Sequence, residues 1–159
     1  MTGDEEAAEP VVRRIGPEDA GEVLTVQRAA FVSEALIYGD ADQPALTQTF
    51  EQLEAELHDA GGFVAVVGER IVGAIRTRER GEVLEVGRIA VAPDQQGAGV
   101  GRMLLAAAEE ATGCAVAELF TGSLSEANLR LYQDCGYAEY ERIDQGDGTA
   151  QVFLRKRLR

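Results

Sequence analysis

Residues 83–121 read VLEVGRIAVAPDQQGAGVGRMLLAAAEEATGCAVAELFT. The stretch opens with a β-prone run that Pro93 stops, and three glycines then alternate with other residues over 97–101. An apolar pattern at helical spacing follows over residues 100–111, and residues 115–121 are again β-prone. This order predicts two parallel strands joined by a crossover helix.

The flanking sequence predicts further strands and helices around this unit. Turn residues at 68–70 and 145–148 each separate two β-prone runs, which indicates two antiparallel hairpins. Gly113 is the predicted C-terminal cap of the central helix, and Ser125 is the predicted N-cap of the last one. The predicted strands are 11–15, 63–67, 71–78, 82–92, 115–121, 137–143 and 151–158, and the flanking helices are 20–31, 46–57 and 125–135. We therefore expect a mixed sheet with helices on both faces.

Length and composition indicate one globular domain. The chain has 159 residues, of which 45% are hydrophobic, and no apolar run approaches the roughly 20 residues that span a membrane. Residues 1–10 are acidic, small and polar without the pattern of a secretory signal, which predicts a disordered tail. We expect residues 11–159 to form a single domain of a cytoplasmic protein that does not bind membranes.

The charge balance narrows the choice of ligand. Fifteen basic residues against twenty-eight acidic ones give a net charge of −13, which disfavours nucleic acid and favours cationic small molecules. Cys114, Cys135 and the single histidine, His58, make a poor metal set, so we expect packed thiols and no metal site.

The glycines just before the central helix point to an anion. Backbone N–H groups at a helix N-terminus are unpaired and carry partial positive charge, and glycines let a phosphate reach them. Arg102 lies in the first turn, where a cation is mildly unfavourable unless an anion compensates it. The spacing matches neither a P-loop nor a dinucleotide fingerprint. A glycine-rich turn without a ligand is the structural alternative.

Two motifs carry a family resemblance. Gln96-Gly97-Ala98-Gly99-Val100-Gly101 resembles the pyrophosphate-binding loop of the GCN5-related N-acetyltransferase (GNAT) superfamily. Asn128-Leu129-Arg130-Leu131-Tyr132, followed by Cys135-Gly136-Tyr137, is similar to that family's later motif. The resemblance implies an α/β fold of the α+β type. Its mixed, mostly antiparallel sheet of six to seven strands would be splayed between the fourth and fifth strands.

The resemblance also implies acetyl-CoA as cofactor. The backbone of residues 89–91 would pair with the pantetheine arm as another strand does, and Gly87 is a candidate bulge that opens the gap beside it. An N–H near Ile89 or Ala90 would bind the oxyanion. The implied cofactor-binding residues are Ile89, Ala90, Val91, Gln96, Gly97, Ala98, Gly99, Val100, Gly101, Arg102 and Asn128.

Acetyl transfer to an amine needs a proton donor at the departing thiolate and a means of deprotonating the amine. Tyr132 lies one turn after Asn128, and the resemblance makes it the donor, although a core tyrosine would show the same spacing. Glu85 interrupts an apolar strand and is the candidate base, with Glu82 as second choice. Many family members use a water chain instead, and the sequence does not decide between the two.

The resemblance places the acceptor between the first two helices, where Phe31, Glu34 and Tyr38 are the candidate substrate-binding residues, with Asp40 and Asp42 nearby. Solvated surface acids are the alternative reading of this segment. The predicted function is direct transfer of an acetyl group to the primary amine of a small molecule, with cationic acceptors favoured.

A non-catalytic acyl-CoA-binding sensor or partner module on the same fold is the alternative, and the donor could also be a longer acyl-CoA. Neither cysteine suits an acyl carrier. The sequence does not determine the oligomeric state, and a homodimer is a state that the resemblance allows.

Overall fold

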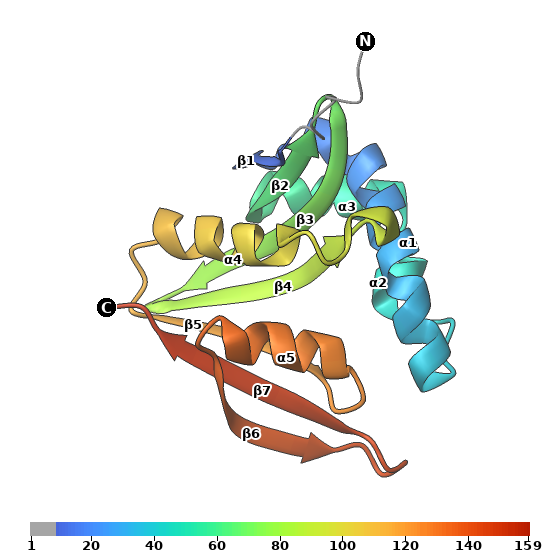
Figure 1. Cartoon of the computed structure of the whole chain (residues 1–159), viewed down its shortest axis with the longest axis vertical. Helices are drawn as coiled ribbons and strands as arrows, with labels where there is room; N and C mark the ends of the chain where they lie inside the picture. Colours follow the sequence, from blue (N-terminus) through green and yellow to red (C-terminus); the bar gives the residue numbers. More distant parts are fainter. Residues whose placement is uncertain (1–8) are drawn as a thin grey trace, which may run out of the picture.

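The computed structural model describes residues 9–159, which build a single seven-stranded sheet with helices on its two faces (Figure 1). The strand order is β1-β2-β3-β4-β5-β7-β6, in which only the β4–β5 pair is parallel. The strands are β1 (Val11–Arg14), β2 (Gly61–Val67), β3 (Arg70–Arg80), β4 (Val83–Val91), β5 (Val116–Gly122), β6 (Ala138–Asp144) and β7 (Ala150–Arg157). The predicted mixed, mostly antiparallel sheet is confirmed. The predicted tail falls almost entirely on residues 1–8, which lie outside the described residues.

Two helix layers enclose the core. Helix α1 packs on β3 and β4, and α4 covers β1 to β4 from the other face (Figure 1). The helices are α1 (Ala20–Tyr38), α2 (Pro44–Thr47), α3 (Phe50–Asp59), α4 (Val100–Ala111) and α5 (Glu126–Asp134), with single 3-10 turns η1 (Pro17–Asp19) and η2 (Pro93–Gln95). Within the described residues, no helix is both long enough and apolar enough to cross a membrane.

Local capping chemistry explains where the helices differ from the prediction. Helix α1 continues to Tyr38 and ends at Gly39, which adopts the left-handed conformation at φ 63°. The predicted second helix is split, because Thr49 begins α3 with a capping box in which its Oγ1 accepts from the Gln52 N–H at 3.1 Å. Gly113 is not a cap, since α4 ends at Ala111 and its C-cap residue, Thr112, has an extended conformation.

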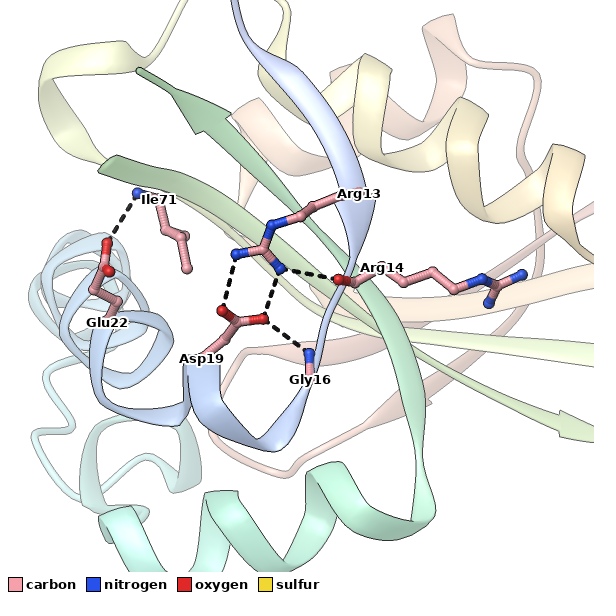
Figure 2. A network of polar contacts seen from close by, with 6 residues as sticks. All are labelled: Arg13, Arg14, Gly16, Asp19, Glu22 and Ile71. Atoms are coloured by element: carbon pink, nitrogen blue, oxygen red, sulfur yellow. Dashed lines mark hydrogen bonds and ion pairs between the residues drawn. The ribbon is translucent and has the colours of Figure 1, made fainter. Parts of the chain in front are cut away.

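A polar network holds the start of α1 against the sheet (Figure 2). The buried Asp19 carboxylate accepts hydrogen bonds from Nη1 and Nη2 of Arg13, each at 2.9 Å, and from the Gly16 N–H at 2.8 Å. The hydrogen bonds from Arg13 hold the pKa of Asp19 below its ordinary value. One turn later, Glu22 accepts the Ile71 N–H at the start of β3. These bonds fix the direction in which α1 crosses the sheet.

A buried ion pair ties α3 to the same face. The Arg76 guanidinium of β3 pairs with Glu56 and donates to Gln48 Oε1 at 3.3 Å. Gln48 Oε1 also accepts from Gln27 Nε2 of α1 at 3.1 Å. Burial lowers the pKa of Arg76 to about 10, so the side chain remains charged at neutral pH. A buried charge without a partner is strongly destabilising, and Glu56 supplies that partner. This network sets the position of the α2–α3 segment relative to α1.

Candidate active site

The strands β4 and β5 separate in the middle of the sheet. They pair only where Val83 to Glu85 face Val116 to Glu118. Past that point, β4 carries a bulge, because two steps along β3 from Ala74 to Arg76 correspond to three steps along β4. Arg88 occupies the bulge at φ 49°, next to Gly87 where the sequence had suggested one. The splay predicted between the fourth and fifth strands is therefore present, and within residues 9–159 it leaves one edge of β4 without a strand partner over residues 87–91.

A cavity of about 640 Å³ lies between this free edge, α1, the glycine loop and the start of α5. We call it the loop-side cavity. Nine of the eleven residues predicted to bind the cofactor line it, from Ile89 and Val91 on β4 to Asn128 on α5. The other two, Ala90 and Ala98, are not part of the lining; the Ala90 side chain is buried in the core.

The three alternating glycines have two different roles. Gly97 and Gly99 have φ of 85° and 82°, and a side chain added at either would meet nothing within 4 Å. Gly99 is the N-cap residue of the twelve-residue helix α4 and offers no side-chain cap, so the helix start faces the cavity with backbone donors. This arrangement fits a pyrophosphate. Gly101 instead lets α4 approach α5, since its Cβ would lie 3.0 Å from Leu131 Cδ2.

Arg102 has a counter-charge within the chain. Its Nη2 donates to Asp134 at 3.1 Å, and its Nη1 lies 4.0 Å from Cys135 Sγ, although the side chain also lines the loop-side cavity. The cation in the first helical turn is thus compensated without a ligand, which weakens the sequence argument from Arg102 alone. Burial raises the pKa of the Cys135 thiol, which opposes a role as nucleophile.

A second cavity, of about 430 Å³, adjoins the first. We call it the hairpin-side cavity, because it reaches the β6–β7 turn. Both cavities are lined by Phe31, Glu34, Ile89 and Asn128. Two of the three predicted acceptor-binding residues are in this shared set, and the third, Tyr38, lines the hairpin-side cavity.

Sequence reasoning missed several residues of the hairpin-side cavity. Arg88 projects from the β4 bulge, Phe120 comes from β5, and Gln145, Asp147 and Gln151 come from the C-terminal hairpin. The turn signal at 145–148 predicted the hairpin correctly. No local pattern in those residues indicates that the turn lines the same cavity as α1.

Tyr132 is a buried residue in the lining of the hairpin-side cavity. Only 6% of the residue is exposed, and its ring stacks edge-on against Tyr137 with centroids 6.3 Å apart. Burial, and then the negative charge of Glu34, raises the pKa of the Tyr132 phenol above its ordinary value. The hydroxyl therefore carries its proton at neutral pH and is available as a donor.

Glu34 accepts two hydrogen bonds where the cavities meet. Ser125 Oγ donates to one carboxylate oxygen at 2.6 Å, and Asn128 Nδ2 donates to the other at 3.3 Å. Ser125 occupies the position before α5, but its hydroxyl makes no cap hydrogen bond, contrary to the expected N-cap role. Asn128 thus connects Glu34, one of the predicted acceptor-binding residues of α1, to the loop-side cavity.

Glu85 is not brought together with Tyr132. It lies in the paired half of β4, its carboxylate is 3.5 Å from Arg80 Nε, and it lines neither cavity. The second choice, Glu82, is exposed ahead of β4, where its carbonyl accepts the N–H groups of Ala115 and Val116. Among residues 9–159, no group of three or more His, Cys, Asp or Glu side chains is arranged to hold a metal ion.

Comparison with known proteins agrees with this geometry. Residues 28–137 match the model of the acetyltransferase (GNAT) family, whereas no curated protein sequence matches the chain. The PaiA N-acetyltransferase of Thermoplasma acidophilum, solved with coenzyme A, is 18% identical with a TM-score of 0.74, over 93% of this chain and 98% of that one. An N-acetyltransferase from Staphylococcus aureus is 16% identical with a TM-score of 0.74, over 96% and 100%. A chimeric spermidine N-acetyltransferase from Vibrio cholerae is 18% identical with a TM-score of 0.74, over 95% and 96%.

Proposed function

The chain belongs to the acetyltransferase (GNAT) family, and from this premise we propose that it transfers an acetyl group from acetyl-CoA directly to the primary amine of a small molecule. The observation that carries the proposal is the meeting of two cavities between the splayed strands, with Glu34 and Asn128 in both linings and Tyr132 in the lining of the hairpin-side cavity. Solved neighbours of the same fold contain coenzyme A, or are N-acetyltransferases by name.

The loop-side cavity offers groups that suit two parts of coenzyme A, the pyrophosphate and the pantetheine arm. Backbone N–H groups around Gly97 and Gly99 would bind the pyrophosphate at the start of α4. The free edge of β4 at Ile89 and Val91 would pair with the amides of the pantetheine arm. When bound, acetyl-CoA supplies a thioester that an amine can attack.

The residues around the meeting of the two cavities would act on protons and charge. A lysine-like amine has a pKa of about 10.4, so only about one molecule in a few thousand is neutral at pH 7. The acceptor therefore needs a group that takes a proton, while Tyr132 holds one that it can donate as a hydrogen bond to a developing thiolate. We assign no such role to Glu85, which lies outside both linings.

The acceptor class that we propose is a cationic amine. Glu34, Asp40 and Asp147 line the hairpin-side cavity, where Arg88 is the one cationic side chain among the described residues of the lining. Three carboxylates against one guanidinium favour a ligand that carries positive charge.

Calorimetric titration of acetyl-CoA tests the cofactor site. Wild type is expected to bind, and Gly99→Glu is expected to lose binding, because the new carboxylate would occupy and repel the pyrophosphate position. The matched control is Gly68→Glu in the β2–β3 turn, which also has a positive φ of 63° and open space before it. It imposes similar backbone strain but should bind normally.

Acetyl transfer is then tested with a panel of amines, and the release of free thiol from acetyl-CoA is the quantity measured. Failure of the wild type to bind acetyl-CoA would contradict the cofactor assignment. Binding without acetylation of any amine would instead favour a non-catalytic acyl-CoA-binding module, and faster transfer from longer thioesters would identify a different acyl donor.

A further inference from the structure

A directed chain of hydrogen bonds ends at Glu34. The Leu124 N–H donates to Tyr38 Oη at 3.0 Å, Tyr38 Oη lies 2.8 Å from Ser125 Oγ, and Ser125 Oγ lies 2.6 Å from a Glu34 oxygen. A backbone N–H can only donate and a carboxylate can only accept, while each hydroxyl has one proton to give. The Ser125 proton therefore points to Glu34, and the Tyr38 proton points to Ser125.

The fold makes specific room for this chain. A Cβ at residue 122 would lie 2.1 Å from Tyr38 Oη, so Gly122 at the end of β5 is required for the tyrosine to reach the loop before α5. Ser125 is only 2% exposed, and its hydroxyl serves Glu34 instead of the helix start. Residues from α1, β5 and α5 are thus arranged around a single carboxylate.

The Glu34 carboxylate faces the space where the two substrates would meet. It lines both cavities and accepts at both oxygens, which is what an ionised carboxylate offers. Within residues 9–159 it forms no ion pair with Arg, Lys or His. The negative charge of Glu34 contributes to the raised pKa of Tyr132. The other charged side chains that line these cavities are Asp40, Arg88, Arg102, Glu126 and Asp147.

We propose that Glu34 is the proton acceptor for the incoming amine, and that Tyr38 and Ser125 are positioning residues that hold its carboxylate. The inference rests on the proposed acetyltransferase function. In this step an N–H bond of the ammonium breaks, its electron pair stays on nitrogen, and an O–H bond forms on Glu34. The resulting neutral amine is the nucleophile, and Glu34 later returns its proton to water.

The test is Glu34→Gln measured against a series of primary amines of different pKa. Glutamine keeps an oxygen that accepts from Ser125 but is not basic. At pH 7, kcat is expected to fall about 100-fold for amines of pKa near 10, as for loss of a general base. For amines of pKa below 7, which are already mostly neutral, the variant should approach the wild type. Glu54→Gln, at an exposed position of α3, is the matched control and should not change kcat.

The positioning residues have a separate readout. Ser125→Ala should lower kcat by about 10-fold without changing acetyl-CoA affinity, since one charge-assisted hydrogen bond is lost. The conservative Ser125→Thr should recover part of that rate.

Each failure points to a different conclusion. An equal loss for all amines in Glu34→Gln would overturn the proton-acceptor role and leave Glu34 as a binding group. Full activity of Glu34→Gln with amines of high pKa would overturn it as well. Absence of acetylation by the wild type would remove the proposed function itself, and this inference with it.

Discussion

At the residue scale, the proposed chemistry uses a tyrosine that does not easily lose its proton. The pKa of the Tyr132 phenol is raised by burial and by Glu34, and that of a thiol, at about 8.5, lies far lower. Complete proton transfer to a leaving thiolate is therefore uphill. In the proposed mechanism Tyr132 therefore stabilises the developing charge by donating a hydrogen bond and keeps its own proton.

Tyr132→Phe is expected to lower kcat by about 10- to 100-fold with little change in acetyl-CoA affinity, because the lost interaction forms only as the thiolate develops. Steady-state kinetics and calorimetry would measure the two effects. The control is Tyr137→Phe, which removes a buried hydroxyl that donates to Glu109 at 2.9 Å and lies off both cavities. It should cost stability without lowering the kcat of the folded protein. Unchanged turnover in Tyr132→Phe would exclude Tyr132 from the mechanism.

The two candidate bases show what sequence can say about a single side chain. Glu85 was noticeable because it interrupts an apolar strand, yet it lies in the paired half of β4 beside Arg80. Glu34 lies in the mostly apolar stretch FVSEALIY, residues 31–38, where nothing local indicates a base. Its importance depends on Ser125, 91 residues away, which no local pattern could indicate.

At the element scale, the β4 bulge opens the site, and the backbone of Arg88 in this bulge has an unfavourable left-handed conformation. A non-glycine residue in the left-handed region costs about 1–2 kcal/mol. Arg88→Gly is therefore expected to be about 1 kcal/mol more stable than Arg88→Ala in denaturant unfolding. At Glu85, an extended position of this strand, the glycine variant should instead be less stable than the alanine variant, because glycine weakens a regular strand. Equal stabilities at residue 88 would mean that the bulge is relaxed in solution.

Turn and capping residues explain which elements could be predicted. The two hairpins and the β4–α4–β5 unit follow from local turn and periodicity signals, and they are present. The extension of α1 to Tyr38 was missed because its last turns, with Val32 and Leu36 exposed, lack an amphipathic pattern. That extension carries both Glu34 and Tyr38.

At the scale of the whole molecule, the net charge of −13 should favour cationic acceptors at long range. Raising salt from 0.01 to 0.1 M shortens the Debye length from about 30 Å to about 10 Å. We expect kcat/KM for a dicationic diamine to fall by about tenfold over this range, because its encounter is electrostatically steered. An amine of pKa below 7, which is neutral, should respond little. Equal salt responses would contradict steering.

The sequence by itself determined the order of strands and helices along the chain and the glycine loop, because strand and helix periods and turn residues act over a few neighbouring positions. The family followed from the resemblance of two motifs, residues 96–101 and 128–137. Only the tertiary structure decided which side chains meet. The β4 bulge opens the sheet, the β6–β7 turn and α1 line one cavity, and the absence of a side chain at Gly122 lets Tyr38 reach Ser125, which hydrogen-bonds Glu34. Those contacts join residues distant in sequence, and they depend on how the sheet splays and the helices pack on it.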